Sequence, residues 1–271
     1  MATKKYICKV CGYVHEGDKA PAICPVCKAP ASEFEEVKAE KKALNRDSNA
    51  YTIIYASVMV ILVAVVLAFT SQSLKETQLK NEKIDKMMQI LRSVKVPATT
   101  ENAEAQYTEL IKESYLVDAQ GQKVEGDAFT ANVVESFATH TNLPVFVASI
   151  DGQTKYILAM RGAGLWGPLW GYISFDDDKN TVYGADFSHQ GETPGLGAEI
   201  TQSFFSNEFV GKKIFNGAGD FKSIAIVKPG KSVEGQDYVD GISGGTITSQ
   251  GVNKMIFTSL SDYVEFLKSK N

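Results

Sequence analysis

The chain has 271 residues, which is long enough for one good-sized domain and additional segments. Its formal net charge of -4 at pH 7 argues against nucleic-acid binding through a basic face. All four cysteines lie near the N-terminus, and the last of them is Cys27. No disulfide framework can therefore hold the large C-terminal region together, so that region must rely on a hydrophobic core.

The cysteines form two Cys-x-x-Cys pairs, Cys8 with Cys11 and Cys24 with Cys27. Two such pairs put four thiolates within reach of one tetrahedral metal ion, and backbone amides beside each pair can hydrogen-bond to the sulfurs. A module of about forty residues has too little apolar material to fold alone, so metal binding would supply much of its stability. A structural zinc ribbon uses the same ligand set, so the spacing leaves zinc and iron both open.

The residues around these ligands carry a resemblance to a known family. They are Tyr6, Cys-Gly-Tyr-Val-His at 11–15, Ala-Pro at 20–21, Cys-Pro-Val-Cys at 24–27, Ala-Pro at 29–30 and Phe34. This stretch resembles the compact rubredoxin domain of rubrerythrins, which holds a single iron in four cysteines as a one-electron carrier. The resemblance implies an iron site, with zinc as the alternative, in a rubredoxin-like module of residues 1–37.

A membrane anchor is predicted after a polar linker at residues 38–47. Residues 48–74 contain no charged side chain, and an apolar run of this length can cross about 30 Å of hydrocarbon as a helix. Tyr51 and Tyr55 are placed to act as interfacial anchors. A buried core helix is the alternative, whereas a cleavable signal peptide is disfavoured because a folded module precedes the run.

Residues 75–96 are predicted to form a connecting helix that extends the anchor. One apolar stripe follows helical spacing through this segment. Its members are Ile84, Met87, Met88 and Leu91. We expect the stripe to pack on the C-terminal domain or on another protein of a membrane complex.

The C-terminal domain, residues 97–271, is predicted to be a compact α+β domain. Asp-Gly at 151–152 between strand-like runs 143–150 and 154–160 indicates a hairpin. Two further strand-like runs follow at 170–175 and 181–187, and residues 251–270 are spaced for a helix or a broken pair of helices. The whole chain is therefore expected to be multidomain: a small metal knuckle, one transmembrane helix and an α+β domain.

A glycine-containing stretch at 240–249, Asp-Gly-Ile-Ser-Gly-Gly-Thr-Ile-Thr-Ser, is the main candidate for a binding site. It lies between a strand-like run and a helix expected to begin near Gln250. Backbone N–H groups and the positive end of a helix suit a phosphate, and the glycines let a bulky group approach the Thr246 hydroxyl. The alternative is a polar turn that caps the helix through Thr248 or Ser249.

Two other glycine-rich segments need an interpretation. Residues 162–171 hold both tryptophans, either as core-filling aromatics in a loop or as the lining for a planar ring. Residues 189–197 contain Glu192 and Thr193, which could hydrogen-bond a ligand, but alone this segment indicates only a turn.

The stretch at 240–249 resembles the Asp-x-x-Ser/Thr-Gly-Ala-Thr signature of flavoproteins that carry FMN on a threonine through a phosphoester bond. With the two glycine-rich segments, it makes residues 48–271 similar to the FMN-binding domain shared by the C subunit of the sodium-translocating NADH:quinone reductase and the G subunit of the Rnf complex. The resemblance implies covalent FMN on Thr246. It implies further flavin contacts at Ser243, Gly244, Gly245, Leu165, Trp166, Glu192, Thr193 and Leu196.

The sequence Gly-Leu-Trp-Gly-Pro-Leu-Trp-Gly favours the quinone reductase over Rnf. The resemblance implies an electron-transfer subunit that is inactive alone, because the redox chemistry belongs to the cofactor and the chain needs no catalytic residue. It also implies other membrane subunits as partners and a separate flavin transferase. The alternatives are the Rnf-type G subunit, a stand-alone flavoprotein that reduces an extracytoplasmic acceptor, and a non-redox assembly protein with a zinc ribbon.

The expected location is a bacterial inner membrane, crossed once. Lysines and arginines on the two sides of residues 48–74 nearly balance, so they do not decide the orientation. Thiolate metal sites suit a reducing cytosol, and the resembling family places its flavin domain outside. We therefore expect a cytoplasmic N-terminus and a periplasmic FMN domain.

Overall fold

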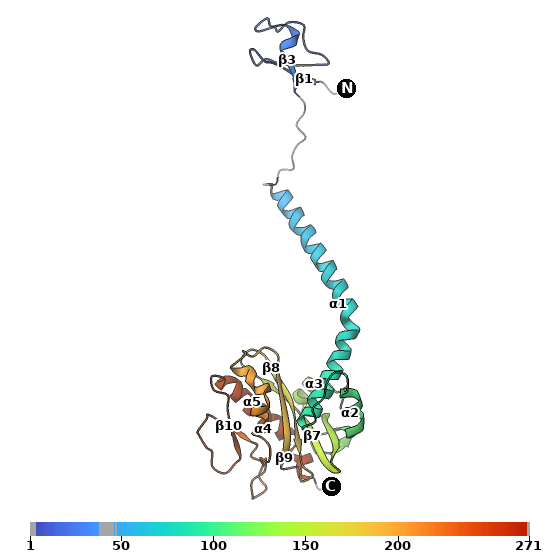
Figure 1. Cartoon of the computed structure of the whole chain (residues 1–271), viewed down its shortest axis with the longest axis vertical. Helices are drawn as coiled ribbons and strands as arrows, with labels where there is room; N and C mark the ends of the chain where they lie inside the picture. Colours follow the sequence, from blue (N-terminus) through green and yellow to red (C-terminus); the bar gives the residue numbers. More distant parts are fainter. Residues whose placement is uncertain (1–3, 38–45, 47, 270–271) are drawn as a thin grey trace. The chain divides into compact units, whose positions relative to one another are not determined.

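The computed structural model describes residues 4–37, 46 and 48–269, so most of the predicted linker at 38–47 lies outside the described residues. The chain divides into two compact units, Met1–Leu74 and Lys75–Asn271 (Figure 1). The division falls within one long helix, and each unit is described by itself.

The N-terminal module is a small antiparallel sheet with two cysteine loops. Strands β1 (Lys4–Cys8), β2 (Val14–Gly17) and β3 (Phe34–Val37) pair in the order β2-β1-β3, and a 3-10 turn, η1 (Ala31–Glu33), precedes β3. Among its described residues, the only buried ones are Cys8 and Cys24. An apolar core is therefore nearly absent, which supports the expectation that a metal stabilises this module.

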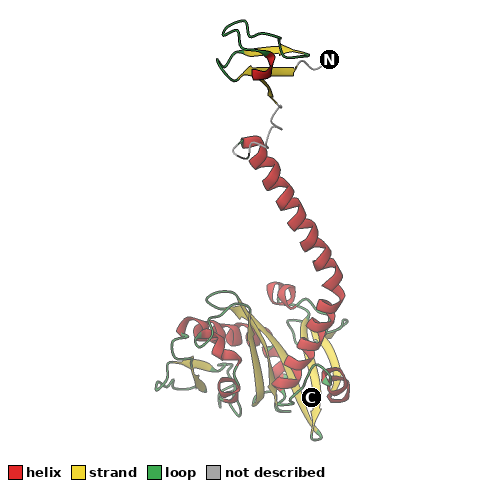
Figure 2. Cartoon of the chain, turned by 45° about the horizontal axis from the view of Figure 1, so that its top comes forward, coloured by secondary structure: helices red, strands yellow, loops and turns green. Residues whose placement is uncertain are grey.

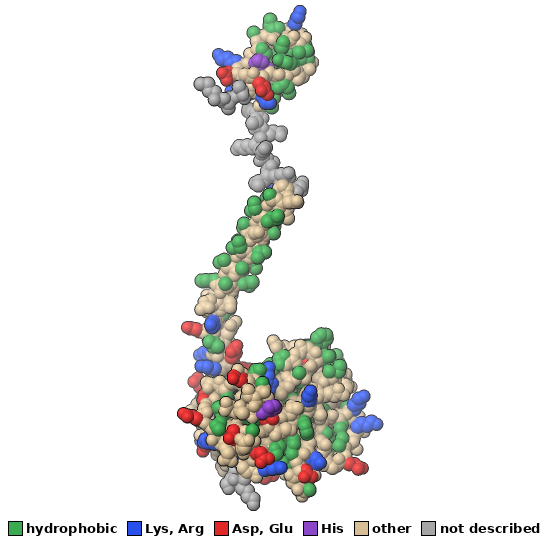
Figure 3. All heavy atoms as spheres, turned by 180° about the vertical axis from the view of Figure 1, so that it is seen from behind, with side chains coloured by type: hydrophobic (Ala, Val, Ile, Leu, Met, Phe, Trp, Pro, Cys, Tyr) green, Lys and Arg blue, Asp and Glu red, His purple; other side chains and the backbone are tan. Residues whose placement is uncertain are grey.

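Helix α1 (Asn49–Ser93) is 45 residues long. Its most apolar window has a mean hydropathy of 2.7 and no buried residue, and Figure 3 shows apolar side chains along the face of the helix that is in view. The alternative of a core helix is therefore wrong, and α1 is long and apolar enough to cross a membrane. The helix continues through the predicted connecting segment and ends at Ser93, slightly before the expected end at 96.

The second unit is an α+β domain around one antiparallel sheet (Figure 2). Its first half contains α2 (Ala103–Leu110), β4 (Ile111–Val117), β5 (Lys123–Val124), α3 (Val133–Thr139), β6 (Leu143–Ile150), β7 (Gln153–Ala163), β8 (Pro168–Phe175) and β9 (Val182–His189). Its second half contains η2 (Gly197–Thr201), α4 (Ser203–Asn207), β10 (Ala225–Val227), β11 (Tyr238–Asp240), α5 (Thr246–Asp262) and α6 (Val264–Lys268). The sheet order is β5-β4-β6-β7-β8-β9, and β10 and β11 form a separate parallel pair.

The two faces of the sheet bury two different hydrophobic clusters. One cluster joins the sheet to α5, where Val252, Met255 and Ile256 are fully buried. The other joins the opposite face to Ile90 at the end of α1 and to Val94 directly after it. Because side chains alternate along a strand, β7 supplies both clusters, and the sheet is covered on both sides.

The structure confirms the β6–β7 hairpin and corrects other boundaries. Both residues of its turn have positive φ, 50° at Asp151 and 76° at Gly152, as a tight hairpin turn requires. The segment 162–171 is not mainly a loop, because β7 and β8 extend into it and leave only a short turn. Helix α5 begins at Thr246 and not near Gln250, and a second helix, α6, follows it, so the broken pair of helices is confirmed.

Candidate functional site

Three segments that are distant in sequence meet around the start of α5. They are the β7–β8 turn at 164–167, the loop that follows β9 at 190–197, and the residues before Thr246. Glu192 bonds to the first segment and to α5, and a Cβ placed on Gly244 would lie 2.7 Å from the Leu196 side chain. The fold thus brings together all three segments that the sequence singles out.

The start of α5 exposes a hydroxyl and unpaired backbone donors. Gly245 is the N-cap and makes no side-chain cap, because it has no side chain. The N–H groups of Thr246, Ile247 and Thr248 find no acceptor in the part of the chain that the structure describes. Thr246 is exposed, so its hydroxyl lies beside three free N–H donors at the positive end of a helix.

The predicted capping alternative is wrong. Thr248 is 2% exposed, and its hydroxyl donates to Glu192 Oε2 at 2.5 Å. The Ser249 hydroxyl accepts from the backbone N–H of Ile242 at 2.9 Å. Both side chains face into the domain from inside the helix, so neither one caps it.

A cavity of about 260 Å³ borders Thr246 on the side of the parallel β10–β11 pair. Its walls come from the carboxyl ends of β10 and β11 and from the first turn of α5. Among the described residues that line it, Lys228 alone is cationic, and this residue is exposed. The cavity can therefore hold part of an anionic group beside Thr246.

The other side of the site is apolar. Trp166 is 68% exposed, and Leu165 and Leu196 are also exposed. The interpretation of segment 162–171 as core-filling aromatics is therefore wrong for Trp166. Three exposed apolar side chains near a helix start suit one flat ring system better than they suit water.

Glu192 and Thr193 differ in accessibility. Thr193 is exposed, whereas Glu192 is 4% exposed and accepts from Trp166 N at 3.0 Å and from the Thr248 hydroxyl. Burial raises the pKa of Glu192, but donors from Thr248, Trp166 and Leu165 outweigh it, so the pKa is lowered overall. The sequence contains no signal for this arrangement, because its partners lie 26 and 56 positions away.

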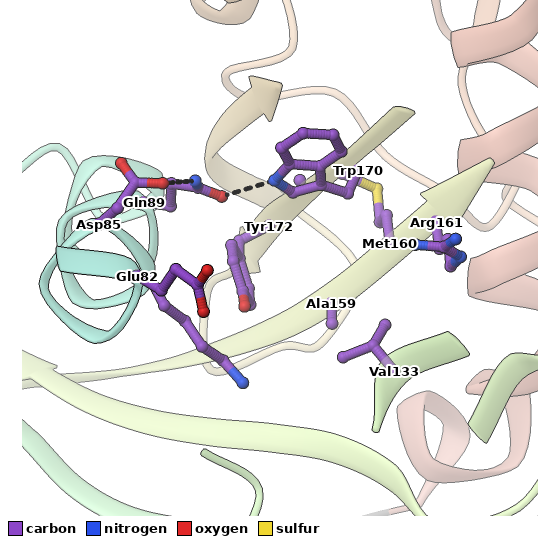
Figure 4. Close-up of a pocket in the computed structure, with 11 residues that line it drawn as sticks. Glu82, Asp85, Gln89, Val133, Ala159, Met160, Arg161, Trp170 and Tyr172 are labelled. Atoms are coloured by element: carbon purple, nitrogen blue, oxygen red, sulfur yellow. Dashed lines mark hydrogen bonds between the residues drawn. The ribbon is translucent and has the colours of Figure 1, made fainter. Parts of the chain in front are cut away.

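A second cavity, of about 270 Å³, lies between α1 and strands β7 and β8 (Figure 4). The Gln89 amide donates to Asp85 Oδ2 at 2.6 Å, and its carbonyl accepts from the Trp170 indole N–H at 3.1 Å. None of the predicted flavin residues lines this cavity. Its polar network joins α1 to β8, the strand that follows the Trp166 turn.

The four cysteines form a metal-binding group. Their Sγ atoms all lie within 4.8 Å of one another. The Sγ atoms of Cys8 and Cys27 are 3.7 Å apart, and those of Cys11 and Cys24 are 3.6 Å apart. A tetrahedral ion with metal–sulfur distances of about 2.3 Å separates its sulfurs by about 3.8 Å, so the spacing fits one metal ion and is too long for a disulfide.

Backbone donors support this site. Backbone N–H groups of Tyr13, Val26, Cys27 and Ala29 act on the cysteine sulfurs in the direction that lowers the pKa of a thiol. Such donors stabilise thiolates and orient the metal ligands, as predicted for the two Cys-x-x-Cys loops. No histidine joins this group among the described residues.

Comparison with known proteins identifies both parts of the chain. Residues 164–261 match the FMN-binding domain family, and residues 6–35 match the rubrerythrin, rubredoxin-like domain family. The C subunit of the Na(+)-translocating NADH-quinone reductase of Haemophilus ducreyi is 31% identical over 229 residues, which are 77% of this chain and 88% of the relative. This chain belongs to that C-subunit family.

Other members agree with this assignment. The C subunit of Neisseria meningitidis serogroup B is 30% identical over 234 residues, which are 78% of this chain and 89% of the relative. The crystal structure of the C subunit of Parabacteroides distasonis is 67% identical, with a TM-score of 0.71, and the match covers 73% of this chain and 98% of that one. The resemblance stated from the sequence is confirmed, and the three converging segments lie within the matched FMN-binding region.

Proposed function

We propose that this chain carries FMN as a phosphoester on Thr246 in a sodium-translocating NADH-quinone reductase. Family membership and the FMN-binding domain make it an electron-transfer flavoprotein subunit of that complex. Bound FMN supplies the redox chemistry, and the residues of this chain attach it, orient it and shield it from water. The observation that carries the proposal is the exposed Thr246 hydroxyl beside three N–H groups that have no acceptor among the described residues.

The residues around Thr246 fit the two ends of FMN. Free N–H groups and Lys228 complement the charge of a phosphodiester. Ser243, Gly244 and Gly245 border the attachment point, and the last two carry no side chain that would obstruct it. The exposed apolar side chains, with Thr193 beside them, are the surface for the ring; they are Leu165, Trp166 and Leu196.

This chain depends on partner subunits for the complete reaction. Its six-stranded sheet is antiparallel throughout, and dinucleotide folds are built on parallel strands with crossover helices. The described domain therefore supports flavin electron transfer and does not support NADH oxidation. Other subunits of the complex must bring electrons to the flavin, and a separate flavin transferase must attach it.

We place the chain in a bacterial inner membrane through α1, with the FMN domain in the periplasm and the N-terminal module in the cytoplasm. A reducing cytosol keeps four thiolates available for a metal. We propose that this metal is iron, because the module matches the rubredoxin-like family of rubrerythrins; zinc is the alternative. The module would then exchange single electrons on the cytoplasmic side.

Substitution of Thr246 tests the attachment site. Thr246→Ala removes one exposed hydroxyl and leaves the core untouched, so the domain is expected to fold while covalent flavin fluorescence disappears from a denaturing gel. Thr258→Ala is the matched control, because Thr258 is an exposed threonine on the same helix. Flavin fluorescence that persists in Thr246→Ala would refute the assignment.

A further inference from the structure

The Glu192 carboxylate connects two walls of the site. Its Oε1 accepts from the backbone N–H of Trp166 at 3.0 Å, and its Oε2 accepts from the hydroxyl of Thr248 at 2.5 Å. Trp166 belongs to the β7–β8 turn, and Thr248 belongs to the first turn of α5. With 4% exposure, this side chain is shielded from a ligand in solvent, and both of its oxygens already have partners within the chain.

The backbone is built to enclose this carboxylate. A Cβ on Gly164 would collide with Glu192 Oε1, and a Cβ on Gly197 would lie 2.7 Å from Oε2 and would collide with the Thr248 hydroxyl. Only glycine therefore lets the turn and the loop close around the carboxylate. The glycines in these two motifs thus serve the Glu192 contact directly.

The loop itself is also fixed. The backbone N–H of Glu192 donates to His189 Nδ1 at 3.1 Å, so the residue is held at its main chain as well as at both oxygens. Its lowered pKa keeps the carboxylate charged at neutral pH, which suits its role as a hydrogen-bond acceptor. A charged and buried acceptor with good geometry is costly to lose.

These contacts determine which side chains of the site point toward solvent. Thr246 and Thr248 are two positions apart on a helix, so their side chains point in nearly opposite directions. Fixing Thr248 inward therefore turns Thr246 outward, and fixing the amide of Trp166 holds the turn that carries the exposed indole against the same carboxylate. Among the side-chain hydrogen bonds of the described residues, those of Glu192 alone join the β7–β8 turn to the first turn of α5.

We propose that Glu192 is a positioning residue: its carboxylate sets the spacing between the Leu165–Trp166 turn and the Thr246 attachment point. It acts through these two segments and not as a direct flavin ligand. The expected consequence, a change in the orientation of the flavin ring, rests on the proposed function. The contact itself can be tested without any flavin.

The first arm of the test measures hydrogen exchange at the Trp166 amide in the full chain, using a Thr246→Ala background that carries no covalent flavin. Glu192→Ala is expected to speed this exchange by about tenfold or more, because the acceptor is lost from an exposed turn. Glu192→Gln is expected to keep most of the protection, since its carbonyl can accept from Trp166 N and its amide can donate to the Thr248 oxygen. Glu199→Ala is the matched control, because this acid lies in the neighbouring turn η2 and its carboxylate accepts from Gly195 N, not from either wall of the site.

The second arm measures the visible circular dichroism of the covalent flavin in the assembled complex. Glu192→Ala and Thr248→Val are expected to change this signal in the same way while attachment to Thr246 persists, and Glu199→Ala is expected to leave it unchanged. Exchange and dichroism like the wild type in Glu192→Ala would overturn the proposal, as would a Gln variant that exchanges as fast as the Ala variant. A wild-type chain without flavin on Thr246 would refute the proposed function and leave the exchange result standing.

Discussion

At the scale of single residues, the start of α5 separates two threonines with opposite roles. Thr246 is exposed and has no partner among the described residues, whereas Thr248 is 2% exposed and bonded to Glu192. This contrast makes Thr246 the only threonine in this turn that can be modified without breaking a buried contact. An attached group at Thr248 would have to displace the Glu192 carboxylate.

The lowered pKa of Glu192 leads us to expect that acid destabilises the FMN domain. Its pKa is lowered in the folded chain from an ordinary value of 4.5, so its stabilising contribution is present above pH 4.5 and is lost as the pH falls through the lowered value. Denaturant unfolding of the detergent-solubilised chain between pH 7 and 3 is expected to show this loss in the wild type. Glu192→Gln should lack that part of the acid response, and an identical pH profile in both chains would contradict the assignment.

At the scale of elements, α1 is joined to the sheet by polar contacts as well as by its apolar stripe. Arg92 donates to Asp186 through Nε at 2.8 Å and through Nη2 at 3.2 Å, a two-point ion pair with β9. Gln89 makes the second contact, to Trp170 on β8. The end of α1 is therefore held to neighbouring strands on one face of the sheet.

Removing the acid of this ion pair should weaken the domain measurably. Asp186→Ala is expected to lower the free energy of unfolding by about 1–2 kcal/mol. Breaking a fully buried ion pair lowers it by more, but the Arg92 side chain is 40% exposed and therefore partly solvated. Denaturant unfolding measures this change. Glu113→Ala is the control, because it removes an exposed pair with Lys123 and should cost well under about 1 kcal/mol. Equal effects of the two substitutions would show that the α1 contact is not stabilising.

The stability of the N-terminal module is expected to depend on its bound metal. Cys24→Ser removes one of the two buried residues of the module and one ligand, so the metal and the folded state of residues 4–37 are expected to be lost together. Metal analysis and the visible spectrum of the purified chain measure this. One iron per wild-type chain supports the proposed electron carrier, whereas stoichiometric zinc from iron-replete cells would favour a structural ribbon.

The sequence predicts some elements better than others, for physical reasons. The apolar anchor, the β6–β7 hairpin and the cysteine pairs depend on local composition or spacing, and each is present in the structure. The local pattern places the start of α5 too late, because Thr-Ile-Thr-Ser is weakly helical by propensity. Contacts from Thr248 to Glu192 and from Ile242 to Ser249 stabilise that turn, and local sequence does not reveal them.

The site residues, too, are only partly predictable from local sequence. The signature around Thr246 can be found from order along the chain, but the exposure of Trp166 and the burial of Glu192 depend on how the strands pair. Lys228 carries no signal in the sequence, since it enters the site only through the β10–β11 pair. Motif order thus predicts which segments meet, and the fold decides which side chains face a ligand.

At the scale of the whole molecule, the rubredoxin-like module is the part that the FMN-binding domain does not explain. Its family match ends at residue 35, and the FMN-binding match begins at residue 164. In the proposed orientation, with the N-terminus in the cytoplasm and the FMN domain in the periplasm, the bilayer would separate the metal from the proposed flavin by about 30 Å of hydrocarbon, too far for direct transfer. We therefore expect the module to be a side entrance or a sensor for the complex.

Deletion of residues 1–37 tests this expectation. The deletion removes the metal module and leaves α1 and the FMN domain, so flavin attachment, assembly and NADH-driven quinone reduction are expected to stay near wild-type levels. Activity of membranes that carry the deleted chain measures this. A complex that assembles with its FMN but no longer reduces quinone would instead make the metal an obligatory relay.

The most direct test of the proposed flavin attachment is peptide mapping by mass spectrometry of the full chain, extracted from membranes with its complex and then denatured. We predict one FMN phosphoester on Thr246, with Thr248 unmodified. A chain that releases all of its flavin on denaturation, or that carries the flavin on another residue, would contradict this assignment.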